Sequence, residues 1–298
     1  MRMSVVIGTR SSKLAIIQAE GVLAKLGEVS PEIEFSLVKI TTTGDWESDT
    51  ALDKFEEQGM FVKELEKALF DGKIDLAVHS LKDLPAEIPE GLSLAATTAR
   101  LDPRDVLVSG AGALANLAPN SKIGTGSPRR AIQLLAYRPD LELHQIRGNI
   151  DTRLRKVFDG ELDGVIVAAA AMIRMGWENK ITEYLSAEHF LPAVGQGALG
   201  IEIRSEDRST AALVSCINHQ PTWQSVTAER AFLEALGGGC RAPIAALGTV
   251  SGNILKLKGM VADENSGHIL RSSEEGDTSA SEVVGVYLAQ KMLGMRAH

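Results

Sequence analysis

Short apolar runs alternate along the first hundred residues with longer segments in which apolar residues recur every three or four positions. The short runs predict buried strands over residues 3–8, 33–40 and 74–78. The longer segments predict helices over residues 13–26 and 61–69, each between two of these strands. This order is typical of a parallel sheet with helices on both faces, so we expect an α/β domain.

The same alternation returns in the middle of the chain. Strands are predicted at residues 122–124, 141–146 and 164–168. Helices are expected to begin after Ser127-Pro128 and after Asn149. Serine and asparagine are typical N-cap residues, and proline suits the first helical position. These elements predict a second α/β unit.

The last part of the chain has a different pattern. Residues 207–236 are predicted to be helical, and they are followed by strands at 244–250, 254–262 and 268–273 and a helix near 280–293. This order indicates an α+β unit. We therefore expect three domains, formed by residues 1–98 with 194–218, residues 99–193, and residues 219–298.

Composition narrows the class of protein. The 298 residues are 44% hydrophobic and 23% charged, as in an ordinary globular enzyme, and the net charge is −8. This acidic balance and the aromatic content of 4% argue against a nucleic-acid partner. Two cysteines cannot form a disulfide framework, and no apolar run suggests a membrane span or a signal peptide. We therefore expect a cytoplasmic protein that binds neither nucleic acid nor membrane.

Positive charge is concentrated in residues 122–156, where eight basic and three acidic residues give a net charge of +5. Ser127 and Pro128 suit the N-cap and first position of a helix, which places Arg129 and Arg130 in its first turn. The helix dipole disfavours cations there, so we interpret the two arginines as partners of an anion. A solvated basic surface is the alternative.

A second helix start also carries arginine. Arg147 lies just before Asn149, and Arg153 lies in the helix that follows. Guanidinium groups suit planar carboxylate or phosphate recognition, so an anionic ligand is expected. Gly124 and Gly126 resemble a phosphate cradle, but the Gly-Lys-Ser/Thr ending of a P-loop is absent, which makes the case for a nucleotide site weak.

Polar residues follow two predicted strands of the first unit. Arg10 and Ser12 follow the first strand, and Lys82 and Asp83 follow the third. Ligands bind beyond the carboxyl ends of parallel strands, so these side chains should meet in one crevice. Asp83 could be a structural ion-pair partner, or it could stabilise a cationic intermediate or transfer protons. His79 could be a base, although a histidine at a strand end is more often structural.

The two cysteines have different surroundings. Cys240 lies in the glycine-rich stretch 237–243, which could be a helix cap and turn around a small buried residue or a loop that presents a reactive thiol. Cys216 lies in an apolar helical stretch and is predicted to belong to the core. The histidines are scattered without ligand spacing, so no metal site is expected.

Eight stretches, in order over nearly the full length, resemble those of the hydroxymethylbilane synthase (porphobilinogen deaminase) family. They are Ile7 through Ser12, Gly59 through Leu65, Val78 through Pro85, Asp102 through Asp105, Gly124 through Arg130, Arg147 through Arg153, Leu191 through Gly200, and Gly238 through Cys240. Each stretch alone is a weak signal, whereas the eight together are specific.

The resemblance implies a fold and an activity. It implies two periplasmic-binding-protein-like (type II) α/β lobes with a cleft, followed by a small α+β domain. The implied enzyme is a transferase that joins four porphobilinogen molecules head to tail, releases four ammonia molecules and yields hydroxymethylbilane for tetrapyrrole (haem) biosynthesis. The cofactor is a dipyrromethane held through a thioether to the cysteine at position 240, and the protein is expected to be a monomer.

The resemblance also implies roles for individual residues. Asp83 matches the catalytic carboxylate, and Cys240 matches the anchor of the cofactor rather than a turnover nucleophile. The residues expected to bind cofactor and substrate are Arg10, Ser12, Gln18, Lys82, Thr125, Ser127, Arg129, Arg130, Arg147, Arg153 and Arg174. The remaining alternatives are a non-enzymatic anion-binding protein on a two-lobed fold and a nucleotide- or phosphate-dependent enzyme.

Two departures from the family pattern are present. The polar stretch 41–58 is predicted to be a mobile loop, and Gln58 near its end replaces the lysine that family members usually carry. Residues 170–172 read Ala-Ala-Met where the family usually has Ala-Gly-Leu. Neither change affects the expected catalytic, anchoring or arginine positions.

Overall fold

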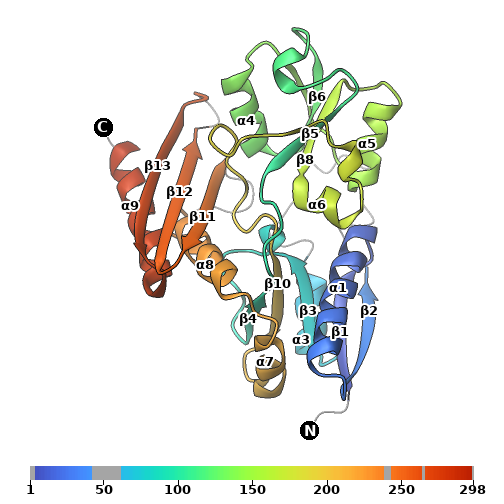
Figure 1. Cartoon of the computed structure of the whole chain (residues 1–298). Helices are drawn as coiled ribbons and strands as arrows, with labels where there is room; N and C mark the ends of the chain where they lie inside the picture. Colours follow the sequence, from blue (N-terminus) through green and yellow to red (C-terminus); the bar gives the residue numbers. More distant parts are fainter. Residues whose placement is uncertain (1–3, 42–61, 238–242, 264–265, 297–298) are drawn as a thin grey trace. The chain divides into compact units, whose positions relative to one another are not determined.

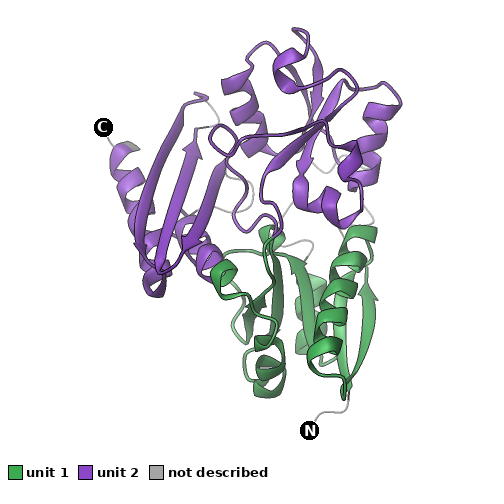
Figure 2. Cartoon of the chain, viewed as in Figure 1, with its two compact units in different colours: residues 1–100, 198–223 green, residues 101–197, 224–298 purple. Residues whose placement is uncertain are grey.

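The computed structural model describes residues 4–41, 62–237, 243–263 and 266–296 (Figure 1). The chain divides into two compact units, which Figure 2 colours separately. Unit 1 comprises residues 1–100 and 198–223, and unit 2 comprises residues 101–197 and 224–298. Most of the predicted loop 41–58, including Gln58, lies outside the described residues.

Unit 1 is built around a five-stranded sheet of order β2-β1-β3-β10-β4. Its strands are β1 (Ser4–Arg10), β2 (Glu34–Ile40), β3 (Leu76–Ser80), β4 (Leu92–Thr97) and β10 (Leu199–Arg204). The first three strands are parallel, as the sequence predicts. The complete sheet is mixed, because β10, a strand that was not predicted, runs antiparallel between β3 and β4.

Helices cover both faces of this sheet, which confirms that part of the prediction. The helices are α1 (Lys13–Val29), α3 (Lys63–Phe70) and α7 (Arg208–Ser215). Val22 of α1 and Val214 of α7 pack with Ile7 on one face, whereas Leu65 and Leu69 of α3 pack on the other.

Unit 2 contains a second five-stranded sheet, of order β7-β6-β8-β5-β9. Its strands are β5 (Asp105–Ser109), β6 (Lys122–Gly124), β7 (Glu142–His144), β8 (Gly164–Ala168) and β9 (Glu183–Tyr184). Strand β6 is parallel to β7 and β8, and β5 is antiparallel to β8 and β9. The helices are α4 (Pro128–Tyr137), α5 (Ile150–Phe158) and α6 (Ala169–Arg174). Leu134 of α4 packs on one face of the sheet, and Leu154 of α5 and Met172 of α6 pack on the other.

The rest of unit 2 is a three-stranded antiparallel sheet with two helices. Its elements are α8 (Gln220–Ala235, which begins in unit 1), β11 (Ile244–Ser251), β12 (Ile254–Ala262), β13 (Ile269–Asp277) and α9 (Ser281–Arg296). A Cβ at Gly259 of β12 would lie within 3.0 Å of both Phe232 of α8 and Leu288 of α9, so both helices cover the same face.

The C-terminal part shares a compact unit with residues 101–197. Each of the three predicted domains has its own sheet, but the predicted boundaries stay a prediction. One core assignment is wrong, because Cys216 lies at the C-cap of α7 and is exposed.

Candidate functional site

Two neighbouring strand ends of unit 1 carry the residues expected there. Strands β1 and β3 are adjacent and parallel, with Ile7 paired to Leu76. Arg10 is the last residue of β1, and β3 runs directly into a short 3-10 helix, Leu81–Asp83. The carboxyl ends of the two strands therefore lie at the same edge of the sheet.

The side chains beyond these strand ends differ in exposure. Ser12 is the N-cap of α1, and its hydroxyl oxygen accepts a hydrogen bond from the Ala15 backbone at 3.4 Å. Lys82 is half-buried and Asp83 is exposed. Asp83 is thus the carboxylate at this edge that an incoming ligand can reach.

Gln18 braces the end of β3. Its side chain is buried, and its Nε2 donates to the Ser80 hydroxyl at 2.8 Å, while that hydroxyl lies 3.1 Å from Gln18 Oε1. The contact joins α1 to the residue that precedes the 3-10 helix. The expected contact of Gln18 with a ligand stays a prediction.

An ionisable cluster lies beside this strand end. His79 of β3 and Glu202 of β10 are both buried, and His79 Nε2 lies 2.9 Å from Glu202 Oε2. Burial raises the pKa of Glu66 on α3, and the charge of Glu202 raises it further, against the opposing effects of His79 and Lys63. The sequence gives no signal for Glu202 or Glu66, because these residues come close to His79 only in the folded sheet.

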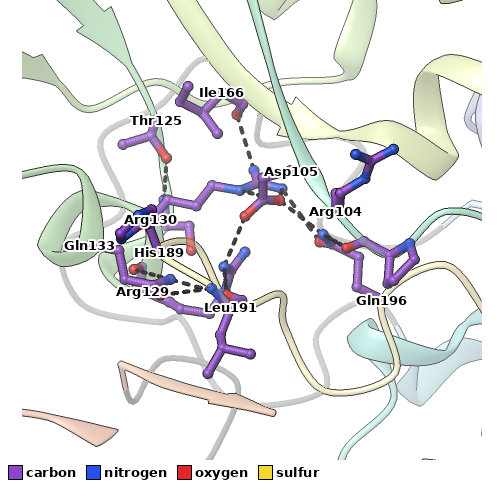
Figure 3. Close-up of polar contacts among 12 residues, drawn as sticks. Arg104, Asp105, Thr125, Arg129, Arg130, Gln133, Ile166, His189, Leu191 and Gln196 are labelled. Carbon is purple, nitrogen blue, oxygen red and sulfur yellow. Dashed lines mark hydrogen bonds and ion pairs between the residues drawn. The ribbon is translucent and has the colours of Figure 1, made fainter. Parts of the chain in front are cut away.

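In unit 2, the first turn of α4 carries a buried charge cluster (Figure 3). Arg129 and Arg130 are only 5% and 7% exposed. Arg129 Nη1 lies 2.9 Å from Asp105 Oδ2, and Arg130 Nη2 lies 2.7 Å from Asp105 Oδ1. Two guanidinium groups therefore share one carboxylate, which leaves a net charge of one positive unit in this cluster.

The arrangement adds an internal partner to the arginines of the first turn. Ser127 is the N-cap and Pro128 the first helical residue, as predicted, although Ser127 makes no side-chain capping bond. Asp105 of β5 supplies one carboxylate for the two arginines, and their expected binding of an external anion stays a prediction. This pairing has no signal in the sequence, because the patterns there do not predict strand β5.

Electrostatic effects within the cluster are strong. Burial alone would raise the pKa of Asp105, but the neighbouring charges of Arg129 and Arg130 outweigh it and hold the pKa far below its usual range. Burial lowers the pKa of Arg129, and the charge of Asp105 partly opposes that effect. Asp105 is therefore charged at neutral pH.

The second arginine-bearing helix start lies beside the first. Arg153 Nε donates to the carbonyl of Gly148 at 2.8 Å. A Cβ added to Gly126 would lie 2.4 Å from the Ile146 carbonyl oxygen and 3.9 Å from Arg153 Nη1. The absence of a side chain at Gly126 thus lets the loop before α4 approach Arg153. Arg147 is exposed, whereas Thr125 in that loop is buried.

Arg174 differs from the α4 arginines. It ends α6, and its Nη2 donates to the Gly197 carbonyl at 2.8 Å. Burial lowers its pKa to about 10. In the part of the chain that the structure describes, no acidic side chain pairs with it. A largely buried guanidinium with only a carbonyl partner can accept an anionic ligand.

The cysteine loop lies largely outside the described residues. Helix α8 ends at Ala235, and Gly237 has a φ of 66°, so the helix-cap interpretation of Gly237 is confirmed. Residues 238–242, which include Cys240, are not described.

Among the described residues, no group of three or more His, Cys, Asp or Glu side chains is arranged to hold a metal ion. None of the described helices is both long and apolar enough to span a membrane.

Fold and site together define the class of protein. Each five-stranded sheet has three parallel strands followed by an antiparallel one, and a small α+β part follows these two α/β parts in the chain. Sequence models of two domains match the chain: "Porphobilinogen deaminase, dipyromethane cofactor binding domain" over residues 5–212, and "Porphobilinogen deaminase, C-terminal domain" over residues 223–294. The chain belongs to the porphobilinogen deaminase family.

Two relatives with the same family name agree with this membership. The chain is 48% identical over 288 residues to the porphobilinogen deaminase of Syntrophus aciditrophicus, covering 96% of this chain and 94% of that protein. It is 46% identical over 292 residues to that of Geobacter sulfurreducens, covering 98% and 92%. Among solved structures, the aliphatic sulphonate binding protein SsuA of Escherichia coli aligns with a TM-score of 0.42 at 12% identity, covering 79% of this chain and 71% of that one.

Family membership confirms several predictions. The chain is a transferase that forms hydroxymethylbilane from four porphobilinogen molecules, and its cofactor is dipyrromethane. The alternative of a non-enzymatic anion-binding protein has no support in these matches.

Proposed function

We propose that the arginines of unit 2 hold the carboxylates of the cofactor and of the growing pyrrole chain while Asp83 of unit 1 promotes each coupling step. The observation that carries this proposal is the excess of buried positive charge. Arg129 and Arg130 share the single carboxylate of Asp105, and Arg174 is largely buried without an acidic partner among the described residues. Buried charge of this kind favours an anionic ligand.

Porphobilinogen matches this charge. Each molecule carries an acetate and a propionate, so a chain of several units presents many carboxylates, and guanidinium groups bind carboxylates with strong charge-assisted hydrogen bonds. The residues that we assign to this binding are Arg10, Ser12, Gln18, Lys82, Thr125, Ser127, Arg129, Arg130, Arg147, Arg153 and Arg174.

We assign the chemical step to Asp83. Positive charge develops on the pyrrole when ammonia leaves, and a nearby carboxylate stabilises it. Asp83 is exposed at the end of the 3-10 helix after β3, so its carboxylate can accept hydrogen bonds from pyrrole N–H groups. Gln18 and Ser80 fix the strand end from which it projects.

The residues fit the dipyrromethane cofactor. The bound cofactor supplies the free pyrrole carbon from which the chain grows. In our proposal Cys240 anchors it through a thioether, and the unbalanced arginines of unit 2 bind its carboxylates. In the sequence, Cys240 lies in the short segment that follows α8, in the C-terminal part of the chain.

The same proposal covers the setting in which the protein acts. We propose that it works as a monomer in the cytoplasm, with porphobilinogen as its small-molecule substrate and without nucleic-acid or membrane partners. The net charge of −8 supports the absence of a nucleic-acid partner.

Intact-mass measurement of the purified protein tests the proposal. We expect a mass above that of the sequence by one covalent dipyrromethane, a ladder of further additions with porphobilinogen, and no covalent cofactor in Cys240→Ser. An unmodified mass that persists after incubation with porphobilinogen contradicts the proposal. Salt-sensitive nucleotide binding without porphobilinogen turnover would favour a nucleotide- or phosphate-dependent enzyme instead.

A further inference from the structure

The C-terminal part of unit 2 forms hydrogen bonds with one loop of the α/β part of that unit at two points. The loop comprises residues 188–197, and we call it the bracing loop. Glu229 of α8 binds it near its end, and Arg271 of β13 binds it at its beginning. All of these residues belong to unit 2.

Glu229 is the more buried of the two contacts. The residue has no exposed surface, and its Oε2 accepts from the Gly195 backbone at 2.7 Å while its Oε1 accepts from the Gly248 backbone at 2.8 Å. A buried carboxylate is tolerated when both oxygens are hydrogen-bonded, as they are here. Gly195 has a φ of 70°, a conformation that suits glycine, so the backbone N–H is held at a sharp bend.

Arg271 makes three contacts with neutral acceptors. Its guanidinium donates to the backbone carbonyls of Glu188 and His189 and, at 3.0 Å, to Gln133 Oε1. Burial lowers the pKa of Arg271, and the described residues give it no acidic partner. Its contacts therefore serve to hold two backbone carbonyls and one amide in place.

Gln133 links Arg271 to Arg129, the first arginine of α4. Its side chain is 1% exposed, and its Nε2 donates to the carbonyls of Leu191 at 3.0 Å and Arg129 at 3.2 Å. The Leu191 carbonyl also accepts a hydrogen bond from Arg129 Nη1. Arg271, Gln133 and Leu191 thus lie in one continuous hydrogen-bonded chain that ends on Arg129, and Figure 3 shows the part around Gln133.

The other end of the bracing loop reaches the same cluster. Gln196 follows the Gly195 that Glu229 holds, and Gln196 Nε2 donates to Asp105 Oδ1 at 2.9 Å. Asp105 is the carboxylate that both α4 arginines share. Both contacts from the C-terminal part therefore converge on the Arg129–Arg130–Asp105 cluster.

We propose that Glu229 and Arg271 are positioning residues that fix the Arg129–Arg130–Asp105 cluster for carboxylate binding through the bracing loop. The proposal rests on the carboxylate-binding role given to these arginines above. Helix α8, which carries Glu229, leads directly into the segment with Cys240. The domain that anchors the cofactor thereby also orients the arginines that bind its carboxylates.

Substitution of Arg271 in the cofactor-loaded enzyme tests this proposal. We expect Arg271→Met to raise KM for porphobilinogen by about five- to tenfold, with kcat changed by less than about twofold, because part of one charged contact is lost. Arg271→Lys should give an intermediate KM. The matched control is Lys256→Met, which removes an exposed ion pair with Glu275 on the same sheet and should leave KM unchanged.

A double-variant cycle separates positioning from plain stability. If Arg271 acts through Arg129, Arg271→Met should not raise KM further in an Arg129→Met background. Two outcomes would overturn the positioning role and leave the carboxylate-binding role intact. In one, the effects of the two substitutions on KM multiply in the double variant. In the other, Arg129→Met raises KM but Arg271→Met leaves it unchanged. A KM unchanged by Arg129→Met overturns the carboxylate-binding role on which the proposal rests.

Glu229→Gln provides a second measurement on an independent contact. It keeps the size of the side chain but places an amide N–H₂ against one of the two backbone N–H groups. We expect it also to raise KM, and the increase should disappear in the Arg129→Met background. A loss of thermal stability with an unchanged KM in both Glu229→Gln and Arg271→Met contradicts the proposal.

Discussion

His79 and Glu202 form a buried hydrogen-bonded pair across two antiparallel strands, with His79 Nε2 2.9 Å from Glu202 Oε2. Among the described residues, the second carboxylate oxygen of Glu202, Oε1, has no hydrogen-bond partner. The pair joins β10 to β3 one residue before Ser80, which in turn holds Gln18. The strand end that carries Asp83 is therefore fixed from two sides.

Removing one partner of this pair should strongly destabilise the protein. In His79→Leu the carboxylate of Glu202 stays buried without its imidazole, and loss of one partner from a buried pair costs about 3–5 kcal/mol. Urea unfolding of the variant and the parent protein measures this difference. The exposed Lys256–Glu275 pair is the control, since Lys256→Met should change the free energy of unfolding by less than about 1 kcal/mol. Similar values for the two variants would contradict the assigned role of burial.

A neighbouring carboxyl group should make stability depend on pH. The pKa of Glu66 is raised, first by burial and then by Glu202, so the folded state holds this proton more tightly than the unfolded state. Stability should therefore fall as the pH rises from about 4, the ordinary range for glutamate, through the raised pKa. Glu66→Gln removes this effect, so it should be more stable than the parent at pH 8 and similar to it near pH 4.

Thermal unfolding of both proteins at the two pH values checks this prediction. Glu87→Gln is a suitable control, because Glu87 is an exposed glutamate of the same unit. The same difference between Glu66→Gln and the parent at both pH values would show that the substitution acts through packing rather than through a proton.

Much of the fold could be predicted because its signals are local. Strands 122–124, 164–168 and 254–262 were predicted with the bounds that the structure has, since each is a short run between clear turn or helix signals. Strands β4 and β10 were missed, and β10 is the antiparallel strand that makes the sheet of unit 1 mixed. Its residues follow a glycine-rich stretch, which gives no clear strand signal.

The candidate site was predictable in its residue types but not in its pairing. The positions of Arg129 and Arg130 in a first helical turn follow from Ser127 and Pro128, which are their immediate neighbours. Their partner Asp105 lies on an antiparallel strand more than twenty residues earlier, and only tertiary structure brings it to the arginines. A contact between residues so far apart in the chain leaves no periodic pattern in the sequence.

Asp83 should be required for turnover but not for folding. Asp83→Asn removes the negative charge that stabilises the cationic pyrrole, so kcat should fall by about 10²–10³-fold. The exposed position of Asp83 predicts an unchanged thermal midpoint. Steady-state turnover of porphobilinogen and thermal unfolding measure the two effects. Glu87→Gln, four residues further along, should retain full activity, and a near-normal kcat in Asp83→Asn would remove Asp83 from the mechanism.

Substitution of Arg174 should weaken the binding of porphobilinogen without lowering the stability of the protein. Its guanidinium is largely buried, and its described partner is the Gly197 carbonyl rather than a carboxylate, so its desolvation is only partly offset. Arg174→Leu should therefore unfold at the same temperature as the parent or above it, while KM for porphobilinogen rises by about tenfold or more through loss of a charged contact. Arg138→Leu is the matched control: Arg138 already pairs with Asp140, so its loss should lower stability and leave KM unchanged. If Arg174→Leu lowers stability without changing KM, Arg174 is a structural residue. Loss of an arginine that binds a ligand carboxylate should instead raise KM without lowering stability.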